Sequence, residues 1–445
     1  GLRPLAAAEY EQDSTAPTAG NNVRYTATTT ITAATAVNSL VIDATTGRTI
    51  TGPASDMEIT SGAILSANAS GTVTHTIAGF GGTNGITTGG GRDYTIYVTS
   101  ATGTLAIDSK LGSALALVKS GAGVLSLTNT ANTFTDVYLN QGSVQVNNFD
   151  KLGTGDLYFF GGNLRLATGF TGDFSGKEFK LGSGGGGIDT NGVNATATNL
   201  ELSGAGDFRK LGTGTLTIGD SSLLSNTGRF VVEAGVLLLN NTLGNSVGAG
   251  GLLISGATPT VRLGAGNQIA DTAAVEIRHG TGTLQLLDLN NFSETIGSLT
   301  ITTTSSGGGV VKTGATGVLT VLGDITMNAN RVNDGGTTEF QNLITGSGAI
   351  GTRTTDGILD LGGVDRRIIV QTTIAVPNRN DAVIETVIQN GGIIKEGDRT
   401  LYLRAANTYA GTTTINNGTL SISSAANLGD SSATNTLAIN HGATL

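Results

Sequence analysis

A carboxylate-rich segment near residue 360 contains the residues best suited to catalysis: Asp356, Asp360, Asp365, Arg366 and Arg367. Ile358, Asp360 and Gly362 alternate along this segment and could lie on one face of a strand. Paired carboxylates about 5–10 Å apart cleave glycosides, and a carboxylate-held calcium beside a basic residue supports elimination. The simpler interpretation is two outward strand residues followed by an Asp-Arg-Arg turn. We favour this interpretation and predict no catalytic residue.

The histidines and one glycine-rich loop are the next candidates for binding chemistry. His75, His279 and His441 are far apart, and none has a second His or a carboxylate at metal-ligand spacing, so we expect surface or loop positions. Gly182, Gly184 and Gly187 have the spacing of a dinucleotide loop, but no helical pattern follows them. We therefore expect a flexible turn that projects from the protein, and no cofactor.

Calcium is a further candidate ligand. The segment Gly186-Gly187-Ile188-Asp189 is a fragment of the nonapeptide found in calcium-binding β-rolls, but it does not recur. The loop aspartates Asp220, Asp271 and Asp430 leave a structural calcium open. We predict no metal site.

An apolar-apolar-basic step before a glycine turn recurs along the chain. Its basic residues are Lys119, Lys210, Lys312 and Lys395, about 80–100 residues apart. These lysines could form a row of ligand-binding groups. At the junction of a strand and a turn, however, we expect them to keep a strand edge soluble and to discourage edge-to-edge pairing.

Short strands must position these residues. Apolar residues alternate with polar ones in many short segments, such as Leu125/Leu127, Val144/Val146, Leu164/Leu166, Leu216/Ile218 and Leu401/Leu403. Turns of Gly or Asn-Gly separate these segments, and we expect Asn140, Asn147, Asn416 and Asn417 to stack in ladders beside the turns. Because each copy is too short to bury its own apolar face, the repetition predicts coils stacked on an axis.

The composition supports a thin core and excludes several partner classes. Glycine supplies 69 of the 445 residues, charged residues 13% and aromatic residues 4%, and Trp is absent, so we expect a core of Val, Ile, Leu, Ala and Thr. The formal charge is −9 without any basic block, which disfavours nucleic acids and anionic membranes. No apolar run reaches the roughly 18 residues of a membrane span. The absence of cysteine excludes disulfides and is compatible with an exported bacterial protein.

The repeated segments resemble the autotransporter-associated β-strand repeat, also called the passenger-associated transport repeat, of bacterial surface proteins. The resemblance is carried by KSGAGVLSL at 119–127 with NTF at 132–134, and by NTYAGTTTINNGTL at 407–420. The segments at 262–277, 287–301 and 1–12 are similar to other parts of such proteins. The copy at Lys312 departs from the pattern by one extra residue, and the copy at Lys395 has Asp398-Arg399 where Ala-Gly is usual.

The resemblance implies an all-β, right-handed parallel β-helix outside the cell, usually without catalytic activity. We predict one continuous β-solenoid over 1–445, with repeat units 1–115, 116–205, 206–305, 306–390 and an incomplete 391–445. We expect a stalk, adhesin or fibre segment of a bacterial surface or secreted protein, with self-association, including end-to-end filaments, or host and matrix glycans as partners.

Two alternatives remain open. A polysaccharide-binding module would show a row of exposed Tyr or Asn-Asp residues on one face. A polysaccharide-cleaving enzyme would show close carboxylates in a deep groove.

Overall fold

The computed structural model describes residues 5–33, 36–67, 72–112, 115–279, 284–303, 308–329, 342–348, 354–372 and 382–445. The chain divides into two compact units: unit 1 contains Gly1–Ala195 and Leu200–Phe208, and unit 2 contains Thr196–Asn199 and Arg209–Leu445. Helical structure in the described residues is limited to short 3-10 turns: η1 (Ala7–Glu9), η2 (Phe149–Lys151) and η3 (Ala425–Leu428).

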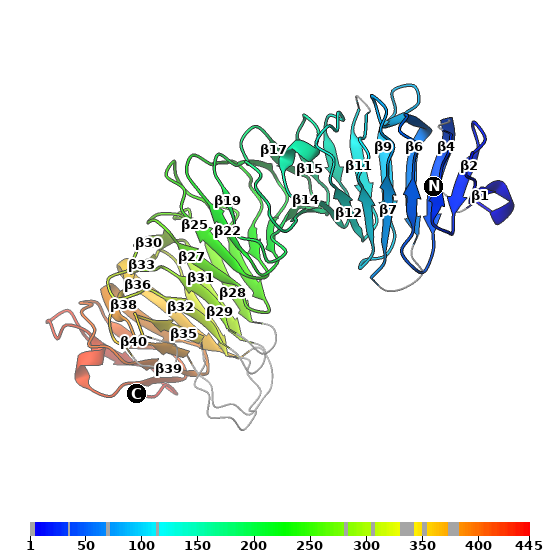
Figure 1. Ribbon diagram of the computed structural model, residues 1–445. Helices are drawn as coiled ribbons and strands as arrows, with labels where there is room; N and C mark the ends of the chain where they lie inside the picture. The colour runs from blue at the N-terminus through cyan, green and yellow to red at the C-terminus, as the bar shows by residue number, and fades with distance from the viewer. Residues whose placement is uncertain are drawn as a thin grey trace. The chain divides into compact units, whose positions relative to one another are not determined.

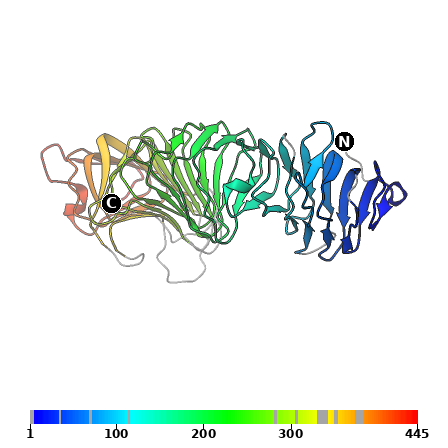
Figure 2. The ribbon, with the colours of Figure 1, turned by 45° about the horizontal axis from the view of Figure 1, so that its top comes forward.

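Unit 1 is built from two parallel sheets whose strands follow one another in chain order (Figures 1 and 2). Sheet A contains β1 (Glu11–Gln12), β2 (Asn22–Tyr25), β4 (Ala36–Asp43), β6 (Met57–Ala67), β9 (Tyr94–Val98), β11 (Leu117–Ser120), β13 (Val137–Leu139), β15 (Leu157–Phe159), β17 (Glu178–Leu181) and β20 (Glu201–Gly204), with β8 (Ile86–Thr88) beside β6. Sheet B contains β3 (Thr29–Thr30), β5 (Thr49–Thr51), β7 (Thr74–Ala78), β10 (Thr104–Ile107), β12 (Val124–Leu127), β14 (Ser143–Val146), β16 (Asn163–Leu166) and β18 (Gly186–Asp189).

Unit 2 likewise consists of parallel strands that follow one another in chain order, in sheet C and in further strands of sheet B. Sheet C contains β22 (Thr215–Ile218), β25 (Val236–Leu239), β27 (Thr260–Leu263), β29 (Gln285–Asp288), β32 (Gly309–Lys312), β35 (Asn342–Thr345), β37 (Ala382–Ile384), β39 (Thr400–Leu403) and β41 (Thr419–Ser421). The strands of sheet B in unit 2 are β24 (Phe230–Val232), β26 (Leu252–Gly256), β28 (Ala274–His279), β31 (Ser298–Thr303), β34 (Ile325–Ala329), β36 (Ile358–Gln371), β38 (Val387–Glu396), β40 (Thr413–Ile415) and β42 (Leu437–Ile439), and β30 (Glu294–Ile296) and β33 (Val318–Val321) join them through β36. Of the remaining strands, β19 (Ala195–Ala197) belongs to sheet C, β21 (Phe208–Leu211) to sheet B and β23 (Leu223–Leu224) to sheet A.

The alternating segments form these strands with their apolar residues inside. Residues in register on β10, β12, β14, β16 and β18 form a continuous buried row: Leu105, Leu125, Val144, Leu164 and Ile188, each 0% exposed. Such a row buries apolar surface only when coils stack, because one coil covers the next. The predicted parallel β-solenoid is therefore confirmed.

Aromatic residues contribute more to the core of unit 1 than the composition predicts. Phe149 and Phe174 pack edge to face with ring centroids 4.9 Å apart, and Phe159 lies 5.5 Å from Phe179. All four rings are buried. The expectation of a core of only Val, Ile, Leu, Ala and Thr is wrong here, since the few aromatic residues are concentrated inside.

Candidate functional site

Three of the recurring lysines lie inside the protein. Lys119, Lys210 and Lys395 are each 0% exposed, so the prediction that they keep a strand edge soluble is wrong. The Nζ of Lys119 donates to the carbonyl oxygens of Ser120 (2.9 Å), Gly121 (2.7 Å) and Gln141 (3.1 Å). The first two carbonyls belong to the two residues that follow the lysine, and the third belongs to the next coil.

The same set of contacts occurs at the other two buried lysines. Lys210 Nζ donates to the carbonyls of Leu211, Gly212 and Ala234, and Lys395 Nζ to those of Glu396, Gly397 and Asn417. An ammonium has three N–H donors, and three carbonyls accept them, which makes burial tolerable. Burial lowers the pKa of Lys119 to about 7. These lysines join consecutive coils and are not available as a row of ligands.

The turn glycine after each buried lysine allows this geometry. Gly121 adopts φ +77°, a left-handed conformation that L side chains rarely adopt. A Cβ at this position would also overlap the carbonyl oxygen of Val98. The Lys-x-Gly step is therefore one structural device.

The third copy of the step lacks this device. Lys312 is half-buried and lies in register with Asp288 on the neighbouring strand. Its side chain therefore does not occupy the fully buried position that the other three lysines share. Thr313 is 0% exposed instead, and its hydroxyl donates to the carbonyls of Gly314 and Thr345, both at 3.1 Å. In this copy the buried residue that bonds to the turn and to the next coil is thus Thr313 and not the lysine.

Buried asparagines form a second connection between coils. Asn132 Oδ1 accepts from the backbone N–H of Leu111 (2.8 Å), and its Nδ2 donates to the carbonyl of Lys151 (2.8 Å). Asn407 makes the matching pair, accepting from Ile388 N–H (2.8 Å) and donating to the carbonyl of Asn427 (2.6 Å).

The asparagines selected from the sequence occupy other positions. Asn140 and Asn147 are exposed, and the Nδ2 of Asn416 donates to Glu396 at 3.3 Å. Asn416 also accepts from Asn440 at 2.6 Å, so one pair does stack on the surface. Asn417 contributes its backbone carbonyl, which accepts from the Nζ of Lys395. The prediction chose asparagines beside Gly turns, while the Asn-Thr-aromatic asparagines make the buried bridges.

The carboxylate-rich segment does not form an open site. Asp360 is 8% exposed and accepts from Gln389 Nε2 (2.8 Å), Asn390 Nδ2 (3.1 Å) and the backbone N–H of Gly362 (2.7 Å). Its oxygens are therefore occupied by neighbours on β36 and β38. Asp356 lies outside β36 and accepts from the backbone N–H and the hydroxyl of Ser347.

The basic part of this segment belongs to a strand and not to a turn. Residues 365–367 lie within β36, beyond a register shift between Asp360 and Val364. Arg367 pairs with Glu396 (2.6 Å) and Asp324 (3.1 Å), and Arg366 Nε donates to the carbonyl of Leu361 (2.8 Å). The predicted Asp-Arg-Arg turn is wrong, because this strand bends at the shift and continues.

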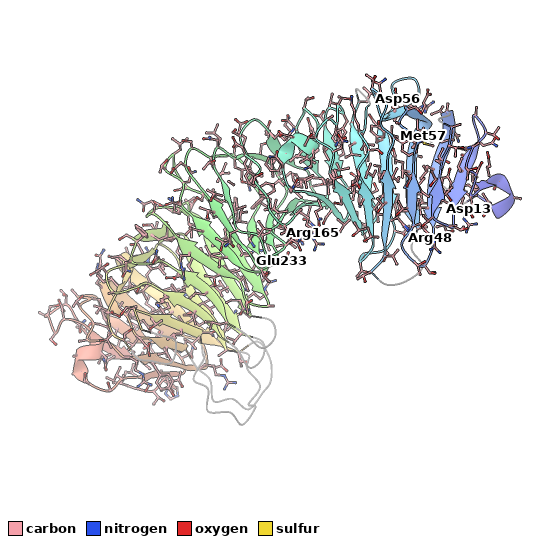
Figure 3. All side chains as sticks on the ribbon, viewed as in Figure 1. Asp13, Arg48, Asp56, Met57, Arg165 and Glu233 are labelled. Atoms are coloured by element: carbon pink, nitrogen blue, oxygen red, sulfur yellow. The ribbon has the colours of Figure 1, made fainter. Side chains whose placement is uncertain are left out.

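The histidines occupy three different environments. His75 is 0% exposed on β7, and its Nδ1 accepts from the backbone N–H of Arg48 (labelled in Figure 3) at 3.2 Å. Burial and the nearby Arg48 charge lower its pKa, which favours neutral imidazole. The expectation of a surface position is wrong for His75 and right for His441, which is exposed. His279 ends β28, and its side chain lies outside the described residues.

The glycine-rich segment packs tightly at the start of β18. Gly185, Gly186 and Gly187 are buried, and a Cβ on Gly186 would overlap Phe159 of the preceding coil. The expectation of a projecting flexible turn is therefore wrong for these residues. Asp189 lies 3.5 Å from Arg165, which Figure 3 labels, and accepts from the backbone N–H of Asn191.

The remaining calcium candidates are separate surface residues. Asp220, Asp271 and Asp430 are exposed, and Asp430 accepts from the backbone N–H of Ser432 at 2.9 Å. Within the described ranges, no three residues among His, Cys, Asp and Glu gather in a group that could hold a metal ion. The same part of the chain contains no helix with the length and apolarity to cross a membrane.

One outward surface of unit 1 gathers aromatic residues that are distant in sequence. We call Tyr138, Tyr158 and Phe160 the aromatic strip. The rings of Tyr138 and Tyr158 stack 4.8 Å apart at 13°, and Phe160 lies 6.4 Å from Tyr138 and is 47% exposed. Lys180 follows Tyr158 in register, with its Nζ 5.0 Å from the ring and 2.7 Å from Asp156.

Tyr138 and Tyr158 are half-buried and Phe160 is exposed, so the aromatic strip matches only in part the row of exposed tyrosines that would indicate a binding module. Tyr138 lies about 20 residues before Tyr158 and Phe160, so the register of β13 and β15 is what brings them together. The sequence does contain an aromatic residue at the same outward position of successive strands. This repetition can be recognised only after the sequences of successive coils have been aligned with one another.

Comparisons with known proteins identify the repeats. The model of the passenger-associated transport repeat matches residues 117–146, 208–239 and 393–422, which contain the three buried lysines and omit the divergent copy at Lys312. No solved structure matches the chain. The adhesin BmaC autotransporter of Brucella suis biovar 1 (strain 1330) is 30% identical over 325 residues, which cover 69% of this chain and 8% of that protein. The recognition made from the sequence is thus confirmed: the chain carries passenger-associated transport repeats on a parallel β-solenoid.

Proposed function

We propose that this chain is an adhesin-like passenger segment of an exported bacterial surface protein, a non-catalytic β-solenoid that presents its outward faces to host or matrix partners. The similarity to an autotransporter adhesin supports this role. The observation that carries it is the aromatic strip, because aromatic side chains are enriched among the residues that dominate binding energy. The recurring Lys and Asn residues, by contrast, are used inside the scaffold.

Adhesion of coated beads tests the proposal. Beads carrying the chain should adhere to cultured epithelial cells or to matrix glycans, and the double variant Tyr138→Ser/Tyr158→Ser should reduce adhesion about tenfold, since an aromatic anchor contributes more than about 1 kcal/mol. Tyr402→Ser is the matched control, because Tyr402 is an outward tyrosine of unit 2 whose ring lies 5.0 Å from Arg404. Unchanged adhesion of the double variant would show that the strip is not the binding surface.

The non-catalytic part of the proposal has its own test. We expect no release of reducing sugars from acidic polysaccharides, because Asp360 is covered by Gln389 and Asn390. Release that disappears in Asp360→Asn while the thermal unfolding midpoint is kept would establish an enzyme instead.

We further propose that copies of the chain self-associate, end to end or laterally, because strand edges of a parallel sheet can pair with another chain. Light scattering should show association that increases with concentration. A monomer at every concentration would refute this association.

A further inference from the structure

A polar pocket lies at the ends of β12, β14 and β16 in unit 1. It has a volume of about 340 Å³, and its hydrogen-bonding residues are Ser126, Thr128, Gln145, Asn147, Lys151 and Thr168. This volume is at the lower end of the range for small-molecule sites. The residues come from three consecutive coils, so only stacking assembles the pocket.

Lys151 is a buried ammonium at this pocket. It is 8% exposed, because η2 is anchored on both sides by Phe149 and Leu152 in the core. Its Nζ donates to Asn147 Oδ1 at 2.5 Å, and no other acceptor within the described residues is found for it. Lys119 has three acceptors for the same three donors, which leaves Lys151 with unused donor capacity.

The pocket provides no carboxylate of its own to Lys151. Asp or Glu is absent from its lining. The hydroxyl of the lining residue Thr128 donates to the exposed Asp108 at 2.5 Å. A buried cation without a paired anion is costly, so an anionic ligand group would stabilise it.

The last matched repeat shows that the fold does not require a lysine here. Asn427 occupies the corresponding position in η3, because its carbonyl accepts from Asn407 as that of Lys151 accepts from Asn132. Asn427 is 2% exposed and bonds within its own turn and to the preceding coil: Oδ1 accepts from Ser423 N–H and Ser424 N–H, and Nδ2 donates to the carbonyl of Ala405. The repeat therefore completes this corner with asparagine, whereas unit 1 places an ammonium beside a pocket.

We infer that this pocket binds a carboxylated monosaccharide unit, with the Lys151 ammonium pairing with the carboxylate and the hydroxyl and amide side chains bonding to the sugar hydroxyls. A dense set of neutral hydrogen-bonding groups fits a polyol better than a simple anion, and the buried cation selects the acidic sugar. This inference deepens the proposed adhesive function by naming a ligand class.

Ligand-observed saturation-transfer NMR on the full chain tests the inference. The probes are methyl β-D-glucuronide, N-acetylneuraminic acid, methyl β-D-glucoside and acetate. We expect saturable binding of at least one acidic sugar and about tenfold weaker binding of the glucoside and of acetate. The acidic sugar should also bind about tenfold more weakly to Lys151→Asn, because this variant loses one charge-assisted contact. The glucuronide and neuraminic acid arms distinguish a uronic acid from a sialic acid.

Three variants separate binding from folding. Lys151→Asn copies the residue of the last repeat and should keep the thermal midpoint, and Gln145→Ala on the outward face of β14 should weaken binding independently. Lys180→Asn, outside the pocket, should bind like the unchanged chain. Equal binding by Lys151→Asn, equal binding of the glucoside, or no saturable binding of any probe would overturn the inference. Because this test does not use the aromatic strip, bead adhesion and sugar binding can fail separately.

Discussion

The recurring lysine shows how a charged side chain becomes part of a scaffold. The ammonium of Lys395 satisfies three backbone carbonyls that would otherwise be buried without donors. The pattern Lys-x-Gly predicts the turn correctly, because glycine is needed for the left-handed conformation. It does not predict the burial, since an exposed and a buried lysine have the same local sequence.

Replacing a buried lysine should destabilise unit 2. For Lys395→Met we expect a loss of about 1–3 kcal/mol, the cost of leaving buried carbonyls unsatisfied. Chemical denaturation measures the loss, and Lys312→Met is the matched control, because Lys312 is half-buried in the divergent copy. Equal effects of the two substitutions would contradict the role given to the carbonyl contacts.

A second residue-scale prediction concerns pH. Glu294 is 1% exposed, and burial raises its pKa to about 7 although the backbone N–H groups of Gln268 and Ile269 donate to it. The folded protein therefore binds a proton that the unfolded chain releases near pH 4.5. The stability that this extra proton contributes to the folded protein is fully present below about pH 4.5 and is lost as the pH rises through about 7.

Comparison with Glu294→Gln measures this contribution. Between pH 5 and pH 8 the unchanged chain should lose roughly 1–3 kcal/mol more stability than the variant, because one pKa unit corresponds to about 1.4 kcal/mol. Urea unfolding at the two pH values provides both free energies. Parallel pH profiles would refute a raised pKa at this residue.

At the scale of elements, the buried asparagines hold neighbouring coils in register. Asn407 links the N–H of Ile388 on one coil to the carbonyl of Asn427 on another, and Asn132 does the same in unit 1. The alternation of apolar residues predicts the strands correctly, since one face of each strand must be buried. It could not identify these asparagines, because their partners lie about 20 residues away in both directions.

Removing one asparagine bridge should loosen its coil. Asn407→Ala should cost about 1–3 kcal/mol and accelerate hydrogen exchange at the amide of Ile388, which loses its acceptor. Asn416→Ala is the control, because its contacts lie at the surface and such changes usually cost under about 0.5 kcal/mol. Unchanged protection of Ile388 would refute the bridge.

At the scale of the whole molecule, stability should be local. In stacked repeats each coil contacts mainly its neighbours, so the free energy of unfolding is close to a sum of contributions from the coils and from the interfaces between them. Lys395→Met should therefore increase hydrogen exchange in β38–β41 and leave β6–β11 of unit 1 unchanged. Exchange that rises equally in both units would instead show a single cooperative structure.

The sequence by itself determined the fold class, the repeat and the absence of an obvious catalytic pattern, because period-2 alternation, glycine turns and recurring motifs depend only on local order. Only the tertiary structure decided that Lys119 and Asn132 face inward, that Asp360 is covered and that Tyr138 stacks on Tyr158. The physical reason is the stacking register. It places residues from successive coils about 4.8 Å apart, and loops of variable length hide that register from the linear sequence.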